Sequence, residues 1–334
     1  MMRFGTTVGG ARPRLECRAV GAAAEAGACG CCEFSDFSRR GFLGAAGAGL
    51  ALAAFGAGTA LAQTAAPVRE ITQIGGNLYR FRNNNHYSVF VVTPQGIIAT
   101  DPINADAAGW LKAQFKERFN QVARYVIYSH DHADHISGGE PFADTATFVA
   151  HENARRTIIG ERRPTPVPQL TLTERMRVEL GGAAVDLVYV GANHSDNSLV
   201  MHFGEQKALF TVDFIPIKAF AFRTLPDAYI PGWVDSLRRV EAMSYDTMIP
   251  GHGPLGKPAD VTNFRVYLEE LHAGVLAGAR AGRTLEQLQA ELTFEKYKDW
   301  GGYQEMRPLN IEGMFRLVQG NRRDNRGGAG PAPT

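Results

Sequence analysis

Hydrophobic and polar positions follow two different spacings along the first half of the chain. Short runs rich in β-branched and aromatic residues begin at Asn77 (NLYRFR), His86 (HYSVFVVT) and Gly96 (GIIATD), and turn-forming Asn, Pro and Gly residues separate them. Such runs predict strands. Residues 105–119 have nearly helical spacing instead. Their apolar positions are Trp110, Leu111, Phe115 and Phe119.

The same two spacings return through the rest of the chain. Further strands are expected at ARYVIYS, ATFVA, VDLVYV, SLVMHF, KALFTVD and DTMIP, and helices from Glu152, near 233–243 and from about 261. The segment 261–318 reads as mostly helical. Strands mixed with helices in both halves predict layered α/β packing, and no linker interrupts it, so we expect one domain over residues 63–320.

The first 62 residues have the pattern of an export signal. Arg39 and Arg40 precede an Ala/Gly/Leu-rich stretch that ends at Ala60-Leu61-Ala62, an A-x-A cleavage signal. The arginine pair followed by Gly-Phe-Leu resembles the twin-arginine motif, which implies the twin-arginine export machinery as a partner and a periplasmic location. An uncleaved membrane anchor is the alternative. Residues 321–334 are rich in Gly and Pro, and we expect a disordered tail.

Charge and cysteine content narrow the function further. The chain has 35 basic and 34 acidic residues, and removal of residues 1–62 leaves 29 and 30. A near-neutral chain gives no indication of a nucleic-acid partner, so we expect a small-molecule substrate. The charge does not indicate an oligomeric state. The four cysteines all precede Arg39, so the predicted domain has no thiol and can fold in an oxidising compartment.

The clearest chemical signal is the run SHDHADH at residues 129–135. In an extended segment His130, His132 and Asp134 project to one side, because side chains alternate with a period of two. His135 can reach the same pocket from another direction as the chain turns at Gly138-Gly139. Imidazole and carboxylate groups are zinc ligands, so this run predicts a zinc site.

The HDHADH run matches the HxHxDH signature of the metallo-β-lactamase superfamily, and further runs extend the resemblance. IIATDPI resembles the early strand that ends in an aspartate, LFTVDF the strand before the bridging acid, and GANHSDNS and MIPGHGP the two later histidine segments. The resemblance implies the family's αβ/βα four-layer sandwich. One departure is Val212, where many members have glycine. The residues that these runs supply are Asp101, His194, Asp213 and His252.

The resemblance also implies a role for each of these residues. His130, His132 and His194 would bind a first metal ion, Asp134, His135 and His252 a second, and Asp213 would bridge the two. Asp101 would accept a hydrogen bond from a ligand histidine. His86 and Tyr87 lie in an expected hairpin near the pocket opening and are candidates for substrate contact. The implied cofactor is two Zn²⁺ per chain, and iron or manganese ranks below zinc.

The function implied is a di-zinc hydrolase. Metal-bound hydroxide would attack an ester, thioester, lactone or lactam carbonyl, and Asp134 would orient the hydroxide or carry a proton to the leaving group. Three alternatives stay open: a β-lactamase proper, an enzyme like the mononuclear iron persulfide dioxygenases, and a periplasmic accessory metalloprotein associated with a quinoprotein. The bridging Asp213 resembles the hydroxyacylglutathione-hydrolase members, whereas many β-lactamases have cysteine or serine there.

Overall fold

Two β-sheets pack face to face in the computed structural model, which describes residues 66–320. The predicted export signal with its arginine pair and cysteines, and the predicted tail from residue 321, lie outside the described residues. The first sheet has seven strands in the order β1-β2-β3-β4-β5-β6-β7 and the second has five in the order β12-β11-β10-β9-β8. The strands of the first sheet are Arg69–Gly75 (β1), Leu78–Asn83 (β2), His86–Thr93 (β3), Gly96–Thr100 (β4), Ala123–Ile127 (β5), Thr147–His151 (β6) and Leu170–Leu172 (β7). Those of the second are Arg175–Leu180 (β8), Ala183–Tyr189 (β9), Leu199–Phe203 (β10), Ala208–Val212 (β11) and Thr247–Pro250 (β12).

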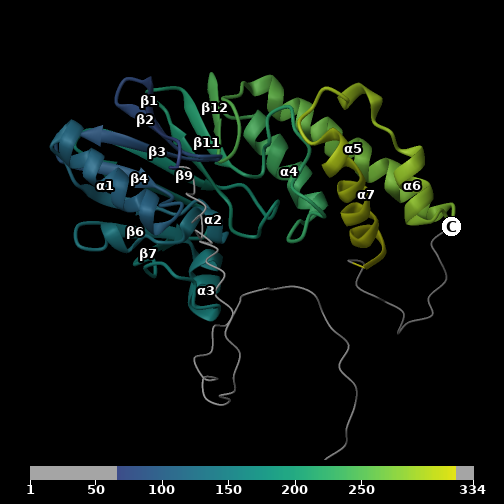
Figure 1. The fold of residues 1–334 in the computed structure, drawn as a ribbon, viewed down its shortest axis with the longest axis horizontal. Helices are drawn as coiled ribbons and strands as arrows, with labels where there is room; N and C mark the ends of the chain where they lie inside the picture. The colour runs from purple at the N-terminus through teal and green to yellow at the C-terminus, as the bar shows by residue number, and fades with distance from the viewer. Residues whose placement is uncertain (1–65, 321–334) are drawn as a thin grey trace, which may run out of the picture. The chain divides into compact units, whose positions relative to one another are not determined.

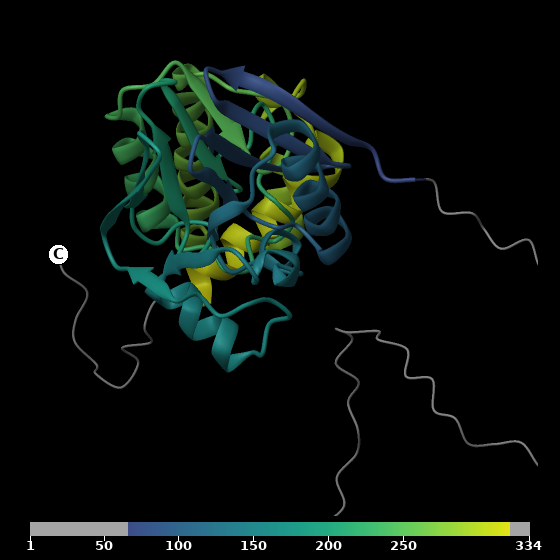
Figure 2. The same ribbon diagram turned by 90° about the vertical axis from the view of Figure 1, so that its left-hand side faces the viewer.

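Helices cover the outer face of each sheet. In Figure 1 the layers follow one another from left to right, with α1 on one outer side and α4, α5, α6 and α7 on the other. Figure 2 shows the same layers from the side of the first sheet. This is the predicted αβ/βα sandwich. The helices are Ala105–Phe119 (α1), Ala133–Ile136 (α2), Glu152–Gly160 (α3), Ile230–Glu241 (α4), Pro258–Arg280 (α5), Leu285–Glu291 (α6) and Tyr303–Gly320 (α7), with 3-10 turns at Glu140–Phe142 and Glu295–Tyr297.

Strand alternation divides the hydrophobic residues among three cores. In β3, Val89 and Val91 face the second sheet, whereas Phe90 between them packs beneath α1. In β11, Phe210 faces the first sheet and Leu209 packs against α4 and α5. Because successive side chains point to opposite faces, a strand buried on both sides is expected to be largely apolar. The all-buried runs of β4 and β11 follow this pattern, with a single threonine in each, Thr100 and Thr211.

Strand direction brings the expected ligand segments to one edge. Strands β4 and β5 are parallel, as are β11 and β12, so each pair ends at the same edge of its sheet. Strand β9 runs in the direction of β11, since both are antiparallel to β10. The segments that follow β4, β5, β9, β11 and β12 therefore lie together. They carry Asp101, His130, His194, Asp213 and His252.

Most of the expected elements are present. Helix α1 spans the predicted residues 105–119, where the Asn104 side chain accepts a hydrogen bond from the Ala107 N–H and Asn120 ends the helix in the left-handed region. The strands β1, β7 and β8 were not predicted from the sequence; they expose much of their length, and β7 is only three residues long. Within residues 66–320, none of the helices has the length and apolar character of a membrane span.

Candidate metal centre

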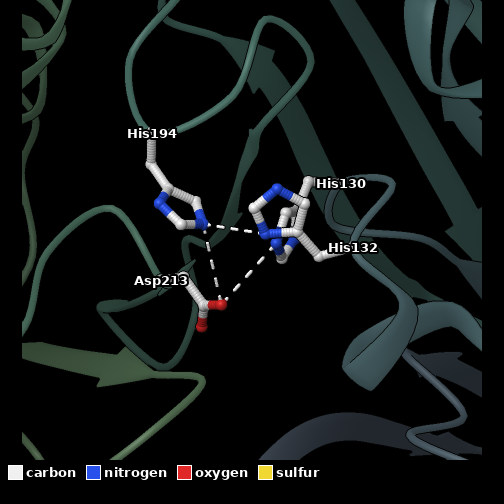
Figure 3. A group of neighbouring side chains, drawn as sticks. All are labelled: His130, His132, His194 and Asp213. Carbon is white, nitrogen blue, oxygen red and sulfur yellow. Dashed lines mark hydrogen bonds and ion pairs between the residues drawn. The ribbon is translucent and has the colours of Figure 1, made fainter. Parts of the chain in front are cut away.

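Seven side chains with metal-binding atoms converge where the two sheets meet at this edge. His130, His132 and His194 form one group with Asp213, and we call it the inner group. Asp134, His135 and His252 form a second group with the same Asp213, the outer group. In each group the candidate ligand atoms lie within 4.8 Å of one another. Figure 3 shows the inner group, in which the three imidazole rings and the carboxylate turn toward a common point.

Asp134 is not placed as an extended segment would place it. The chain is helical over Ala133–Ile136, so Asp134 does not continue the side to which His130 and His132 point. In a helix, neighbouring residues are about 100° apart, and this turn directs Asp134 and His135 into the outer group together. The expected single face of His130, His132 and Asp134 is therefore wrong. The division of the side chains between two groups agrees with the resemblance.

Four of the five histidines have a partner on the ring nitrogen that faces away from the centre. Nδ1 of His130 lies 2.9 Å from the Ser129 hydroxyl, and Nδ1 of His252 lies 2.9 Å from the Asn85 carbonyl oxygen. The other two have carboxylates: Nε2 of His132 is 3.0 Å from Asp227, and Nδ1 of His135 is 3.4 Å from the buried Asp101. Such partners fix the orientation and tautomer of a histidine that binds metal.

The atoms that face the centre fit a metal ion. His130 Nε2 and Asp213 Oδ1 are buried and have no hydrogen-bond partner among the described residues. Buried polar atoms are normally hydrogen-bonded, so two orphaned atoms that point to one place need an explanation. Three histidines with one carboxylate, and two histidines with two carboxylates, are ligand sets that suit zinc. The shared Asp213 side chain is only 11% exposed, which favours cation binding over a role at the surface.

Two histidines of the inner group are held in their neutral form. Burial of the ring, together with the neighbouring His132, lowers the pKa of His130 well below its usual value. Burial also lowers the pKa of His194, to about 4. A neutral imidazole is the form that binds metal, so these two rings are ready at neutral pH. His132 differs: although burial opposes the shift, Asp227 raises its pKa.

The outer group favours protonated histidines in the absence of metal. Burial opposes the shift, but the Asp134 and Asp213 carboxylates raise the pKa of His252 to about 9. Asp213 and Asp101 likewise outweigh burial and raise the pKa of His135. The carboxylates are ionised in return, because hydrogen bonds from His252 and His86 outweigh burial and hold the pKa of Asp134 below its usual value. Metal binding here must release protons.

The backbone approaches the centre closely at Gly251. A Cβ at this position would lie 2.5 Å from Asp213 Oδ1 and 2.7 Å from His135 Cε1, so only glycine fits. Val212, on the neighbouring strand, has a φ of 51°. That conformation is strained for a β-branched residue and would be adopted more easily by glycine. Strain is thus present directly beside the shared carboxylate.

His86 and Tyr87 have different surroundings although they are adjacent. Nε2 of His86 lies 3.3 Å from Asp134, and its ring centroid is 4.6 Å from that of His252. The Tyr87 ring instead stacks on the Arg80 guanidinium at 3.5 Å, while its N–H donates to the Gly251 carbonyl. His86 therefore borders the outer group, and Tyr87 packs beside it. Substrate contact by either residue stays a prediction.

Asp227 is the main site residue that sequence reasoning missed. It lies in the irregular segment between β11 and α4, and its carboxylate contacts His132 Nε2 at 3.0 Å. That contact lowers the pKa of Asp227 and keeps the carboxylate ionised. No motif surrounds Asp227, and 95 residues separate it from its partner. Only the folded chain reveals the contact.

Comparison with known families and curated proteins agrees with this geometry. The family model described as "Metallo-beta-lactamase superfamily" matches residues 123–252, which contain all the ligand-type residues of both groups. The alpha subunit of 2,4-dinitroanisole O-demethylase from Nocardioides sp. (strain JS1661) is 28% identical over 165 residues, 47% of this chain. The chain spans about half (49%) of that relative's length. A metallo-beta-lactamase type 2 from Bacteroides fragilis is 23% identical over 176 residues, which are 52% of this chain and 67% of the relative.

Solved structures agree on the fold. A metallo-beta-lactamase from Pontibacter korlensis superposes with a TM-score of 0.54 at 19% identity and covers 60% of this chain and 99% of its own. One from Hirschia baltica gives a TM-score of 0.52 at 19% identity, with 60% and 97% covered. At this level of identity the likeness concerns the fold, which is that of the metallo-beta-lactamases.

Proposed function

We propose that the chain, whose residues 123–252 match the metallo-beta-lactamase superfamily model, is a di-zinc hydrolase that acts on an ester, thioester, lactone or lactam. The observation that carries the proposal is the pair of ligand groups that share Asp213. Two bound metal ions would supply a nucleophile from water at neutral pH and would polarise the substrate carbonyl. The inner group would hold one ion and the outer group the other.

The exposure of the surrounding side chains indicates from which side a substrate would reach the metal centre. Asp134 is 48% exposed at the open side of the outer group, so a substrate and its leaving group can reach the carboxylate. Its lowered pKa keeps it ionised, which suits a group that accepts a hydrogen bond from water and orients it. His130 and His135 have fully buried side chains and close the opposite side of the centre to solvent. The reaction therefore takes place at the exposed edge of the outer group.

Metal analysis and a substrate screen test the proposal. The purified protein, loaded with zinc, should hold about two ions per chain and hydrolyse at least one member of a panel of esters, thioesters, lactones and lactams. His130→Ala, assayed beside it, should lose metal and activity together. One iron and no zinc in the wild-type protein would favour the iron dioxygenase alternative. Bound metal without turnover on any member of the panel would favour an accessory role.

The similar proteins add two compounds to the screen. The Nocardioides relative is named for O-demethylation of 2,4-dinitroanisole, so an activated aryl methyl ether belongs on the panel. The Bacteroides relative is named a beta-lactamase, so the lactams include a chromogenic β-lactam. In both cases water would replace a leaving group at a polarised centre, which the same ligand groups support. The ranking of kcat/KM across the panel separates these candidates.

We also propose that the domain works in the periplasm. The support is the Arg39-Arg40 pair followed by a weakly apolar stretch and an A-x-A signal. Arg39→Lys combined with Arg40→Lys should retain the protein in the cytoplasm with normal activity in a cell lysate. Fractionation decides the matter, and normal export of the double variant would contradict the twin-arginine route.

A further inference from the structure

The C-terminal helices lie outside the family match but contact a loop of the metal centre. The matched region ends at residue 252, whereas α5 to α7 extend over residues 258–320. Residues 213–229 connect β11 to α4, and we call them the β11–α4 loop. The loop starts at the shared Asp213 and carries Asp227 near its end. Contacts that hold the β11–α4 loop in place therefore also hold the Asp227 carboxylate, which faces His132.

Asn310 of α7 forms the central contact with the loop. Its side chain is fully buried, and its Nδ2 donates hydrogen bonds to the carbonyl oxygens of Ala221 and Arg223, each at 2.8 Å. Its Oδ1 accepts a hydrogen bond from the Tyr267 hydroxyl of α5 at 2.8 Å. Both amide protons of a buried asparagine are thus used on main-chain atoms of one loop. Leucine or aspartate of similar size could not make these two donations.

Two further contacts hold the loop against the same helix. A Cβ at Gly313 would lie 2.1 Å from the Thr224 carbonyl oxygen, so the backbones of α7 and the loop touch directly. The exposed Arg316 side chain donates a hydrogen bond to that same oxygen at 2.9 Å. Earlier in the loop, the Phe220 N–H donates to the carbonyl oxygen of Gly301, just before α7, at 3.0 Å. The loop is thus held at four of five consecutive positions, Phe220, Ala221, Arg223 and Thr224.

The loop needs these contacts because its backbone is strained. Lys218, Arg223 and Leu225 have φ values of 45°, 48° and 53°, a region that non-glycine residues seldom adopt. Such conformations persist only where the surroundings determine them. The Ala228 N–H donates to the Leu225 carbonyl at 3.3 Å, so the strained turn leads directly into the segment with Asp227.

We propose that Asn310 is a positioning residue for the metal centre, which acts through the β11–α4 loop and Asp227 on His132. Asn310 holds the strained turn, the turn sets the position of Asp227, and Asp227 orients the His132 ring so that Nδ1 faces the inner group. The helical segment beyond the family match is therefore part of the metal site's support. The inference rests on the proposed function in one respect, that His132 binds metal.

The test compares Asn310→Asp with Tyr267→Phe. Asn310→Asp keeps the acceptor for Tyr267 but loses the two donations to the loop, whereas Tyr267→Phe removes the third bond of the same buried network and leaves both donations in place. Zinc affinity of the tighter site is measured by competition with a chromophoric chelator. We expect Asn310→Asp to weaken it by about tenfold, at the lower end of the 10–100-fold range for lost outer partners of metal ligands. Tyr267→Phe should leave it unchanged.

A second measurement needs no metal. Trypsin should cleave metal-free Asn310→Asp after Lys218 and Arg223, both exposed, several times faster than the wild type or Tyr267→Phe. Thermal midpoints show whether Asn310→Asp and Tyr267→Phe are destabilised alike.

A third variant keeps the test valid if Asn310→Asp does not fold. Arg316→Gln removes an exposed hydrogen bond to the same loop and should also weaken zinc binding and speed cleavage, by a smaller factor. Equal zinc affinity in all these proteins would overturn the proposal, even if cleavage were faster, because the loop would then be loosened without consequence for the metal centre.

A double-mutant cycle identifies the route. Asp227→Ala should weaken zinc binding 10–100-fold, and Asn310→Asp added to it should have little further effect, because both changes break the same link. Losses that multiply would show that Asn310 acts elsewhere and would refute the route. A wild-type protein without zinc would refute the metal site itself, whereas zinc binding that is unaffected by Asn310→Asp would refute only the inference.

Discussion

The inner and outer groups share one carboxylate but differ in exposure and in protonation. Side-chain exposures in the inner group are 0% for His130, 21% for His132 and 11% for His194. In the outer group His135 is fully buried, but Asp134 and His252 are 48% and 40% exposed. Burial keeps two inner imidazoles neutral, and the carboxylates keep both outer imidazoles protonated. Two groups with the same number of ligand-type residues therefore need not bind metal equally. The inner group should fill first, and the outer group should respond to pH and substrate.

The largest effect should come from the residue that the groups share. Asp213→Ser removes a negative ligand from both ions and lets their repulsion grow. We expect loss of the outer ion and a fall of at least about 100-fold in kcat/KM, the upper end of the range for lost outer partners of metal ligands. Metal stoichiometry and kcat/KM check this, and the thermal midpoint shows that the variant folds. Two retained ions with full activity would leave Asp213 as a turn residue.

Lowering the pH should weaken zinc binding by the outer group more than zinc binding by the inner group. A zinc ion in the outer group must displace a proton from His252, whose pKa is about 9, and one from His135, whose pKa is raised as well. Below pH 9 each proton costs up to about tenfold in apparent affinity per pH unit, so the outer site should weaken by at least about 100-fold from pH 8 to pH 6. In the inner group only His132 has a raised pKa, so the change should be smaller. Competition titrations at three pH values measure the affinity for the first and the second zinc ion. If both affinities fall equally with pH, the two groups do not differ in protonation.

The two outward carboxylates allow the groups to be weakened one at a time. Asp101 faces His135 of the outer group, and Asp227 faces His132 of the inner group. Asp101→Asn should weaken the second zinc step and Asp227→Asn the first, each by about 10–100-fold. Stepwise zinc titration of both variants measures this. If each change weakens both steps equally, the groups are one coupled site.

The smallest effect is expected at the pocket opening. His86 is 29% exposed and lies 3.3 Å from Asp134, so its contact contributes little. His86→Gln should change kcat/KM by about twofold to fivefold and leave two zinc ions bound. Tyr87→Phe tests the other predicted substrate contact and should leave both zinc ions bound, since that ring packs on Arg80 and not on the outer group. A loss of metal in His86→Gln would make His86 part of the outer group.

Much of the candidate site follows from short-range sequence signals. The HDHADH run supplies four of the seven members of the two groups within six positions, and each remaining member follows a strand with a clear apolar pattern. The side chains converge because parallel strands end at a common edge. The predicted side for Asp134 was wrong, because alternation assumes an extended chain and residues 133–136 form the helical turn α2 instead.

Contacts made by irregular segments could not be predicted in this way. Asp227 and Asn310 have no periodic pattern, and their roles depend on partners 95 and 87 or more residues away in the chain. Nor does the sequence show that Val212 and Leu225 adopt left-handed backbone conformations, which β-branched and bulky residues otherwise avoid. Such conformations are stable only in the packed protein.

By itself, then, the sequence determined which residues face the cores and which chemical groups end each strand, because both depend on neighbours a few positions away. The tertiary structure decided which carboxylate supports which histidine, how the side chains divide into inner and outer groups, and that α7 holds the β11–α4 loop. It also decided protonation, since burial lowers the pKa of His194 while Asp134 and Asp213 raise that of His252. These properties depend on distance and desolvation in the folded chain, and sequence position specifies neither.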